Sequence, residues 1–333
     1  MTRLILTFDD GASGALKGAG LADCVVPLGL CFVWGRLRPA NELDTFLSPR
    51  AAKPGGVDFH WLDNLRGPQF DEARKQGLGL IEFCERFDAV ELWADPDPNA
   101  QLQLIWLLDH IRPHAPVVSI SSLVQTDTVI GDRPPADWAE RRLPAVPINS
   151  DHLETASAAW SCWRAPTPVA WFDLLARDLS ALPQLRNTVV ALLEELPARA
   201  TGLGATEMRM LELLAAGHVH PSDLFPGRQK PNDRRTLGYW AAGELLDGLA
   251  HCPAPAIAGL DEGPFDLGLH DAKERHERYK NSSLSPTGLG KAILAQADDF
   301  SRHNPVHRWW GGTELTNDRL WRWDPANRSL IAP

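Results

Sequence analysis

The residues best suited to chemistry stand near the start of the chain, where a short apolar run ends in two carboxylates. Residues 4–17 read LILTFDDGASGALK. Carboxylate oxygens can hold a divalent cation, and backbone N–H groups at the start of a helix can hold a phosphate. The candidate ligand-binding residues of this stretch are Asp9, Asp10, Gly11, Ser13, Gly14 and Lys17.

A second acidic turn follows the apolar run VELWA at residues 90–94, and it contains Asp95 and Asp97. Ligands of open α/β sheets bind beyond the carboxyl ends of strands. If the two runs form neighbouring strands, we expect Asp95 and Gln101 to join the first group at one edge of the sheet. In the simpler alternative, Asp9 or Asp10 only caps the first helix. The G-x-x-G spacing matches neither a dinucleotide motif nor a P-loop.

The elements that must position these residues alternate between strand and helix. Apolar runs predict strands over residues 4–8, 24–28, 88–94 and 116–123, with residues 30–34 as an extension of the second. Helical spacing of apolar residues predicts helices over 69–87 and 100–111. Such alternation is typical of a parallel sheet covered on both faces. Residues 1–150 are therefore predicted to form a Rossmann-like α/β domain.

The rest of the chain is predicted to be mostly helical. Residues 151–200 are expected to form a helical bridge, and residues 201–333 a winged-helix-like domain with a tryptophan-rich end. Within that domain the pattern predicts helices over 205–216, 221–225 and 233–250, the last with Trp240 among its apolar residues. A basic patch precedes the long helix, where a recognition helix would begin to contact phosphates. It contains Arg228, Lys230, Arg234 and Arg235.

Composition limits the classes of function that the chain can serve. The 333 residues carry a net charge of −10, so nucleic acid is a less favoured partner for the basic patch than another protein. No apolar run approaches the roughly 20 residues of a membrane span, and the apolar part of the N-terminus is too short for a signal peptide. The 5 scattered cysteines are typical of a reducing compartment. We therefore expect a cytoplasmic protein without a membrane association.

Several of these segments together resemble an uncharacterised bacterial family, catalogued as domain of unknown function 1835. The similarity covers nearly the whole chain. It rests on Phe8-Asp9-Asp10, on VELWADPDPNAQLQL at 90–104, on RAPTP at 164–168, on the block 182–207, and on the RWWGG and WRWD sequences near the C-terminus. The resemblance implies a Rossmann-like N-terminal part and a winged-helix-like C-terminal part. It implies no activity, because none is assigned to the family.

Three functions are compatible with these patterns. The first is a binding module, in which the N-terminal domain takes a small anionic or nucleotide-like ligand and the C-terminal domain contacts a macromolecule, most simply a protein. The second is a metal-dependent enzyme that uses Asp9, Asp10, Asp95 and Asp97 on a phosphate- or sugar-containing substrate. The third is a transcription-associated or protein-interaction factor. No motif identifies a cofactor, and no histidine pair has the spacing of a structural metal site.

Overall fold

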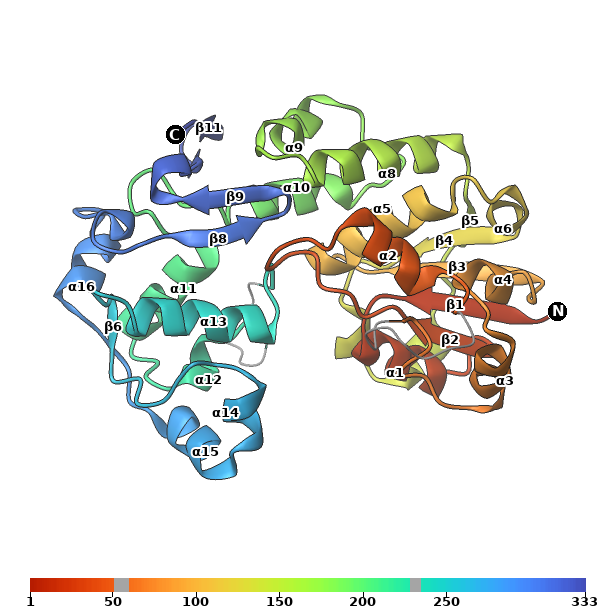
Figure 1. Ribbon diagram of the computed structural model, residues 1–333, viewed down its shortest axis with the longest axis horizontal. Coiled ribbons are helices and arrows are strands. Elements are labelled where there is room, and N and C mark those ends of the chain that lie inside the picture. Colours follow the sequence, from red (N-terminus) through yellow and green to blue (C-terminus); the bar gives the residue numbers. More distant parts are fainter. Residues whose placement is uncertain (51–59, 228–234) are drawn as a thin grey trace. The chain divides into compact units, whose positions relative to one another are not determined.

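The chain forms two compact units in a computed structural model that describes residues 1–50, 60–227 and 235–333 (Figure 1). Unit 1 comprises residues 1–32, 37–161 and 178–185, and unit 2 comprises residues 33–36, 162–177 and 186–333. Residues 151–200, which the sequence predicts to be a helical bridge, are shared between the two units. No helix in the described ranges is long and apolar enough to cross a bilayer.

Unit 1 is built on a five-stranded sheet with the order β2-β1-β3-β4-β5. The first four strands are parallel, and β5 is antiparallel to β4. The fold is therefore mixed α/β, as predicted. The strands are β1 (Arg3–Thr7), β2 (Cys24–Pro27), β3 (Ala89–Ala94), β4 (Ser121–Gln125) and β5 (Val146–Pro147).

Helices connect these strands, and the two central crossovers run in opposite directions. β1 leads through α1 to β2 on one side, whereas β3 leads through α5 to β4 on the other. Because such crossovers are right-handed, α1 and α5 cover opposite faces of the sheet (Figure 1). The helices are α1 (Asp10–Gly18), α2 (Ala40–Leu47), α3 (Pro68–Gln76), α4 (Leu80–Cys84), α5 (Pro98–Ile111), α6 (Ala115–Ser119), α7 (Pro135–Glu140) and most of α8 (Ser150–Trp163).

Three expectations about the local structure of unit 1 were wrong. The first half of the strand predicted over 116–123 is helix α6, and β4 begins only at Ser121, where it pairs with the start of β3. The helix predicted over 69–87 is divided into α3 and α4, because Gly77 ends α3 in a left-handed conformation (φ 65°). Residues 30–34 form no strand.

The core between the sheet and α1 is closed by an indole from the loop after β4. Trp138 of α7 is fully buried and meets Trp93 edge-on, with ring centroids 6.2 Å apart. Its Nε1 donates to the carbonyl of Ile130 at 3.1 Å. The cluster fixes the 3₁₀ turn η1 (Ile130–Asp132) beside the start of α1. The loop after β4 is thereby anchored at the edge of the sheet.

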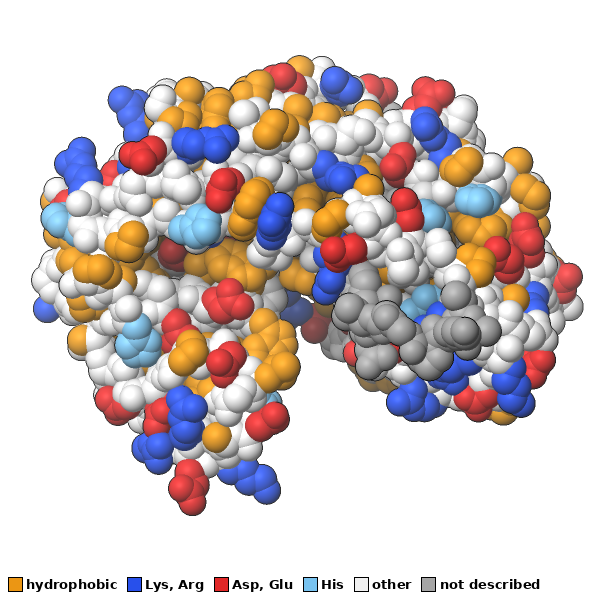
Figure 2. Space-filling model, in the orientation of Figure 1, with side chains coloured by type: hydrophobic (Ala, Val, Ile, Leu, Met, Phe, Trp, Pro, Cys, Tyr) orange, Lys and Arg blue, Asp and Glu red, His pale blue; other side chains and the backbone are white. Residues whose placement is uncertain are grey.

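Unit 2 combines helices with short antiparallel strand pairs. On the face shown in Figure 2, acidic and basic side chains are interspersed. Its helices are α9 (Val169–Asp173), most of α10 (Leu185–Leu193), α11 (Ala205–Ala215), α12 (Pro221–Leu224), α13 (Tyr239–Ala250), α14 (Leu267–Asp271), α15 (Lys273–Asn281) and α16 (Gly288–Leu294). The pairs are β6 (Ile257–Ala258) with β7 (Ser285–Pro286), β8 (His307–Trp310) with β9 (Thr313–Thr316), and β10 (Arg322–Asp324) with β11 (Ser329–Ile331).

The helix predicted over 233–250 is observed as α13, which begins only at Tyr239. Ala241, Leu245 and Leu249 are buried, whereas Trp240 remains 42% exposed. Residues 240 and 244 are one turn apart, so they share the opposite, solvent-facing side of the helix.

The loops at the carboxyl edge of the sheet depend on one buried amide, and its removal is the first prediction. Gln103 of α5 donates to the carbonyl of Phe8 at 2.9 Å and accepts from the N–H of Leu30 at 2.9 Å. Gln103→Leu leaves both backbone groups without partners, so we expect it to lower the free energy of unfolding by about 2–4 kcal/mol in urea denaturation. Gln76→Leu, at an exposed position of α3, is the control, with an expected change within about 0.5 kcal/mol. Equal effects of the two substitutions would contradict the prediction.

Candidate functional site

The acidic turns after β1 and β3 lie at the point where the strand order of the sheet reverses. β1 and β3 are hydrogen-bonded neighbours, with Leu6 opposite Leu92. The condition set by the sequence, that the two runs be adjacent strands, is confirmed. Ligand sites of open α/β sheets occur at such switch points. We call this edge the switch-point rim; its residues are Asp9, Ser13, Asp95, Asp97, Gln101, Asp132 and Gln184.

On the β1 side, Asp9 caps the helix that follows it. Its carboxylate accepts from the N–H of Ala12 at 2.7 Å, and its carbonyl accepts from the N–H of Ser13 at 3.1 Å. The N–H of Gly11 also donates to this carboxylate. The first-turn N–H groups that a phosphate would need are thus bound by Asp9 itself. The capping alternative describes Asp9 correctly.

The turn also depends on close contact between two glycines. A Cβ on Gly131 would lie 3.1 Å from the carbonyl carbon of Gly11. A side chain at this position would push η1 away from the start of α1. Gly11 therefore serves the approach of the loop after β4, and this loop brings Asp132 to the rim.

On the β3 side, two carboxylates are held by backbone N–H groups. Asp95 is 1% exposed and accepts from Ile130 at 2.9 Å and from Asp97 at 3.0 Å. Asp97 caps α5, because it accepts from Asn99 at 2.8 Å and from Ala100 at 3.1 Å. Both helix starts at the rim therefore carry a carboxylate of their own.

Burial and mutual repulsion favour the neutral forms of these carboxyl groups. The pKa of Asp95 is raised to about 6, first by burial and then by the charges of Asp9 and Asp132, against the effect of its backbone hydrogen bonds. Burial raises the pKa of Asp97 to about 7, with the charge of Asp95 as the second cause. Asp9 is exposed as a residue, but partial desolvation of its carboxylate raises its pKa as well. The rim thus holds carboxyl groups that can take up or release a proton near neutral pH.

Two buried polar atoms at the rim have no hydrogen-bond partner within the described part of the chain. The amide Nε2 of Gln101 donates to the carbonyl of Asp95 at 2.7 Å and to Gln184 at 2.9 Å, but its Oε1 accepts nothing. The Oγ of Ser13 is likewise unpaired, although the residue is only 2% exposed. Unpaired buried acceptors are costly and call for a donor from water or from a ligand.

The other predicted ligand-binding residues lie at different places on α1. Asp10 is its exposed first residue, and a side chain at Gly14 would point into open space. Lys17 is in the last turn, so it lies at the far end of α1 from Asp9, near the thiol of Cys24. In the basic patch, Arg228, Lys230 and Arg234 lie outside the described residues. Arg235 is half-buried against Gly227.

The carboxylates do not converge as a metal site on their own. Among residues 1–50, 60–227 and 235–333, no three His, Cys, Asp or Glu side chains are placed to hold a metal ion. The hypothesis of a four-aspartate metal centre therefore lacks the geometry it requires. A cation that arrives with a phosphate needs only one or two carboxylates from the protein.

Sequence reasoning missed two residues of the rim. Asp132 reaches it from the loop after β4, and Gln184 reaches it from the short unit 1 segment 178–185. Asp132 could have been found, because it follows β4, the fourth parallel strand, at the same edge. Gln184 gave no local signal, since only the tertiary fold brings it beside Gln101.

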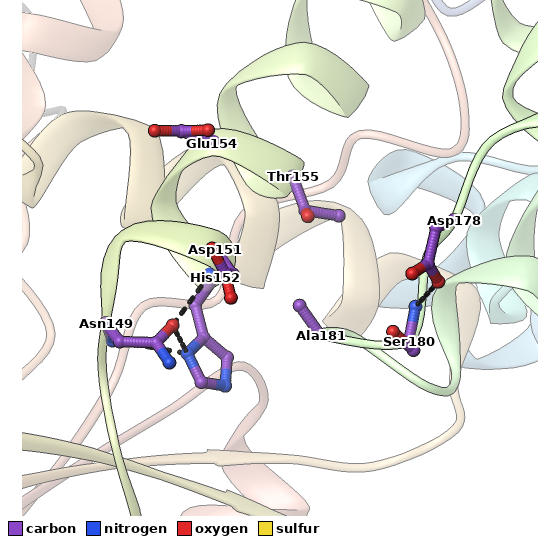
Figure 3. A pocket seen from close by; sticks show the side chains of 8 residues that line it. All are labelled: Asn149, Asp151, His152, Glu154, Thr155, Asp178, Ser180 and Ala181. Carbon is purple, nitrogen blue, oxygen red and sulfur yellow. Dashed lines mark hydrogen bonds between the residues drawn. The ribbon is translucent and has the colours of Figure 1, made fainter.

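A hollow of unit 1 lies between the start of α8 and the segment 178–181, with a volume of about 350 Å³ (Figure 3). Asn149 accepts from the backbone N–H of His152 at 3.1 Å and donates its own N–H to the Nδ1 of His152 at 3.2 Å. Burial lowers the pKa of His152, consistent with a neutral ring in this reciprocal cap. The polar groups of Asn149 and His152 in this hollow thus cap the start of α8, so the rim is the better candidate site.

The raised pKa of Asp97 gives the second prediction. Its folded pKa of about 7 exceeds the unfolded value near 3.8. Between these two pH values the folded state binds more protons than the unfolded state, so the free energy of unfolding falls as the pH rises from one to the other. Asp97→Asn keeps a capping oxygen and removes the ionisation. We expect urea denaturation to show the variant gaining more than about 1 kcal/mol relative to the parent between pH 4 and pH 8.

Asp88→Asn is the matched control for this pH dependence. Asp88 precedes the amino end of β3, and hydrogen bonds from Thr2 lower its pKa. A carboxyl group whose pKa is lower in the folded than in the unfolded state stabilises the folded state at pH values above the unfolded pKa. This stabilisation is lost as the pH falls through the folded pKa. The control should therefore lose stability relative to the parent at high pH, opposite to Asp97→Asn. The same sign for both variants would contradict the assignment.

The sequence was also compared with known proteins. No protein-family model matches the chain, and the search of curated proteins produced no match either. Membership of the family catalogued as domain of unknown function 1835 therefore stays a prediction from the sequence, and the residues of the rim carry the functional argument.

Proposed function

We propose that unit 1 is a small-ligand binding module whose site is the switch-point rim. The observation that carries the proposal is the unpaired Oε1 of Gln101, buried at the end of β3 beside Asp95. A ligand that donates a hydrogen bond would satisfy this atom. The position agrees with the general rule for open α/β sheets.

The charge of the rim specifies the chemistry of that ligand. Asp9 and Asp97 occupy the N-terminal ends of α1 and α5, so a bare phosphate would meet carboxylates instead of free N–H groups. Hydroxyl and amino groups are the donors that carboxylates and amide oxygens accept. A nucleotide-like ligand therefore fits with its sugar toward the rim, and any phosphate is accompanied by a divalent cation.

A second candidate is an enzyme that acts on a phosphate- or sugar-containing substrate. It is favoured by the raised pKa values of Asp95 and Asp97, since a carboxyl group that titrates near neutral pH is suited to general acid or base catalysis. The two candidates share one site. Turnover of the ligand, measured as its consumption in solution, would distinguish the enzyme from the binding module.

For unit 2 we propose a macromolecule-contacting role in a winged-helix-like arrangement. Helices α11, α12 and α13 follow one another, and the antiparallel pair β6–β7 comes after them. A protein is the favoured partner over nucleic acid, because the chain is acidic overall. The transcription-associated role is the version of this proposal in which the partner belongs to that machinery. We expect the protein to act in the cytoplasm.

The third prediction tests the rim with ligands. The full chain is screened by differential scanning fluorimetry against ribose, nucleosides, nucleotides with and without Mg²⁺, and inorganic phosphate. We expect a sugar-bearing ligand to raise the midpoint of unfolding by about 2 °C or more, since a ligand that binds only the folded state stabilises it. Phosphate alone should have no effect, because carboxylates occupy both helix starts.

Isosteric variants then locate the site by calorimetric titration. Asp9→Asn retains the cap of α1 but removes its charge, and we expect it to weaken binding at least about tenfold. Asp88→Asn, at the opposite end of β3, should bind like the parent. The absence of stabilisation by every compound, or equal losses in both variants, would rule out the rim as the ligand site.

A further inference from the structure

Unit 2 carries a shallow pocket that none of the predicted site residues line. It lies between the first turns of α13 and the start of α14, and its volume is about 390 Å³. Over the region of α13 and α14, Figure 2 shows apolar side chains next to acidic ones. The lining residues are Trp240, Glu244, Phe265, Asp266, Leu267 and Gly268.

An aromatic side chain fixes the floor of this pocket. Phe265 is 4% exposed and lies over Gly243, where a Cβ would come within 1.9 Å of the ring. Its backbone N–H donates to Asp247, which holds the chain against α13. Trp240 packs beside it, with ring centroids 5.5 Å apart. The floor is therefore part of the core of unit 2 and keeps its shape without a ligand.

The walls expose large apolar surfaces to water. Trp240 is 42% exposed and Leu267 is 68% exposed. Burial of apolar surface stabilises a contact by roughly 25 cal/mol per Å². Tryptophan is also among the residues that most often dominate the energy of protein interfaces. These two side chains are therefore suited to contact a partner.

Both ionised side chains that line the pocket are acidic, and both are held in place. Glu244 Oε2 accepts from the Nε1 of Trp34 at 2.6 Å. Asp266 caps α14, since it accepts from the N–H of Leu269 at 2.8 Å. The donor is an indole in the first bond and a backbone N–H in the second, so neither bond neutralises the charge of its carboxylate. The pocket thus presents two fixed negative charges beside an exposed indole.

We infer that this pocket binds an arginine side chain, flanked by an apolar residue, from a segment of a partner protein. A guanidinium group stacks on an indole and donates to carboxylates at the same time. The apolar neighbour would cover Leu267. The inference rests on the proposed role of unit 2 in macromolecular contact, and it names the surface and the chemistry of the partner.

The fourth prediction tests the pocket by ¹⁹F NMR of the full chain labelled with 5-fluorotryptophan. Trp240→Phe assigns the resonance of Trp240. The probe is an acetylated and amidated tripeptide of sequence Leu-Arg-Leu, and the comparison peptide replaces its arginine with glutamate. We expect the arginine peptide to shift the Trp240 resonance to saturation and the glutamate peptide to leave it unchanged.

Charge variants identify the carboxylates as the cause. The double variant Glu244→Gln and Asp266→Asn keeps the acceptor for Trp34 and the cap of α14, and we expect it to weaken binding of the arginine peptide at least about tenfold. Glu274→Gln, at an exposed position of α15, is the matched control and should bind like the parent. An unchanged affinity of the double variant would overturn the inference.

Two further outcomes would also overturn it. Equal binding of the glutamate peptide would mean that the pocket selects apolar groups alone. A shift of the Trp240 resonance with protein concentration, without peptide, would identify a second copy of the chain as the occupant. Ligand binding at the switch-point rim is measured separately with Trp240→Phe, so failure of the pocket and failure of the rim are distinguishable.

Discussion

Unit 1 depends on two carboxyl groups, Asp95 and Asp97, whose hydrogen bonds hold the fold although their surroundings disfavour their charged forms. Asp95 must accept from Ile130 to hold the loop after β4, and Asp97 must cap α5. Asp95 is buried and Asp97 is half-buried, and another carboxylate is near each, so the charged forms are costly. The hydrogen bonds favour the charged forms and the burial favours the neutral ones. Their balance leaves both groups able to titrate near neutral pH.

The same constraint connects the elements around the rim. Because Asp95 binds the backbone of Ile130, and Trp138 binds the other side of that residue, the loop after β4 is fixed from both the sheet and α7. The loop in turn lies against Gly11 at the start of α1. A change in the ionisation of Asp95 would therefore affect both helices that start at the rim, α1 and α5.

Much of this architecture could be predicted from local sequence. Continuous apolar runs located β1, β2 and β3 to within about two residues, since strands buried on both faces have that pattern. The failures have physical causes. β4 begins with Ser121 and Ser122, so its apolar pattern is weak, and its position is set by pairing with β3. The preceding apolar residues were free to form α6.

The candidate site was predicted in part, for a related reason. Asp9 and Asp95 follow apolar runs directly, so the rule for strand ends finds them. Gln184 could not be found, because no pattern in residues 178–185 shows that the tertiary fold returns this segment to the sheet. The sequence likewise gives no sign that Asp97 is partly shielded from water. The sequence shows which groups are present at the rim, whereas their protonation depends on packing.

The two units also change what the charges of the chain imply. The sequence suggested an anion at the first turn and a basic contact surface before α13. The geometry shows carboxylates at both helix starts of the rim, and two more beside the exposed Trp240 of unit 2. Acidic groups that remain fixed in a fold select donors and cations over anions. The two proposed surfaces therefore have one chemistry in common, since each presents fixed carboxylates to hydrogen-bond donors and cations.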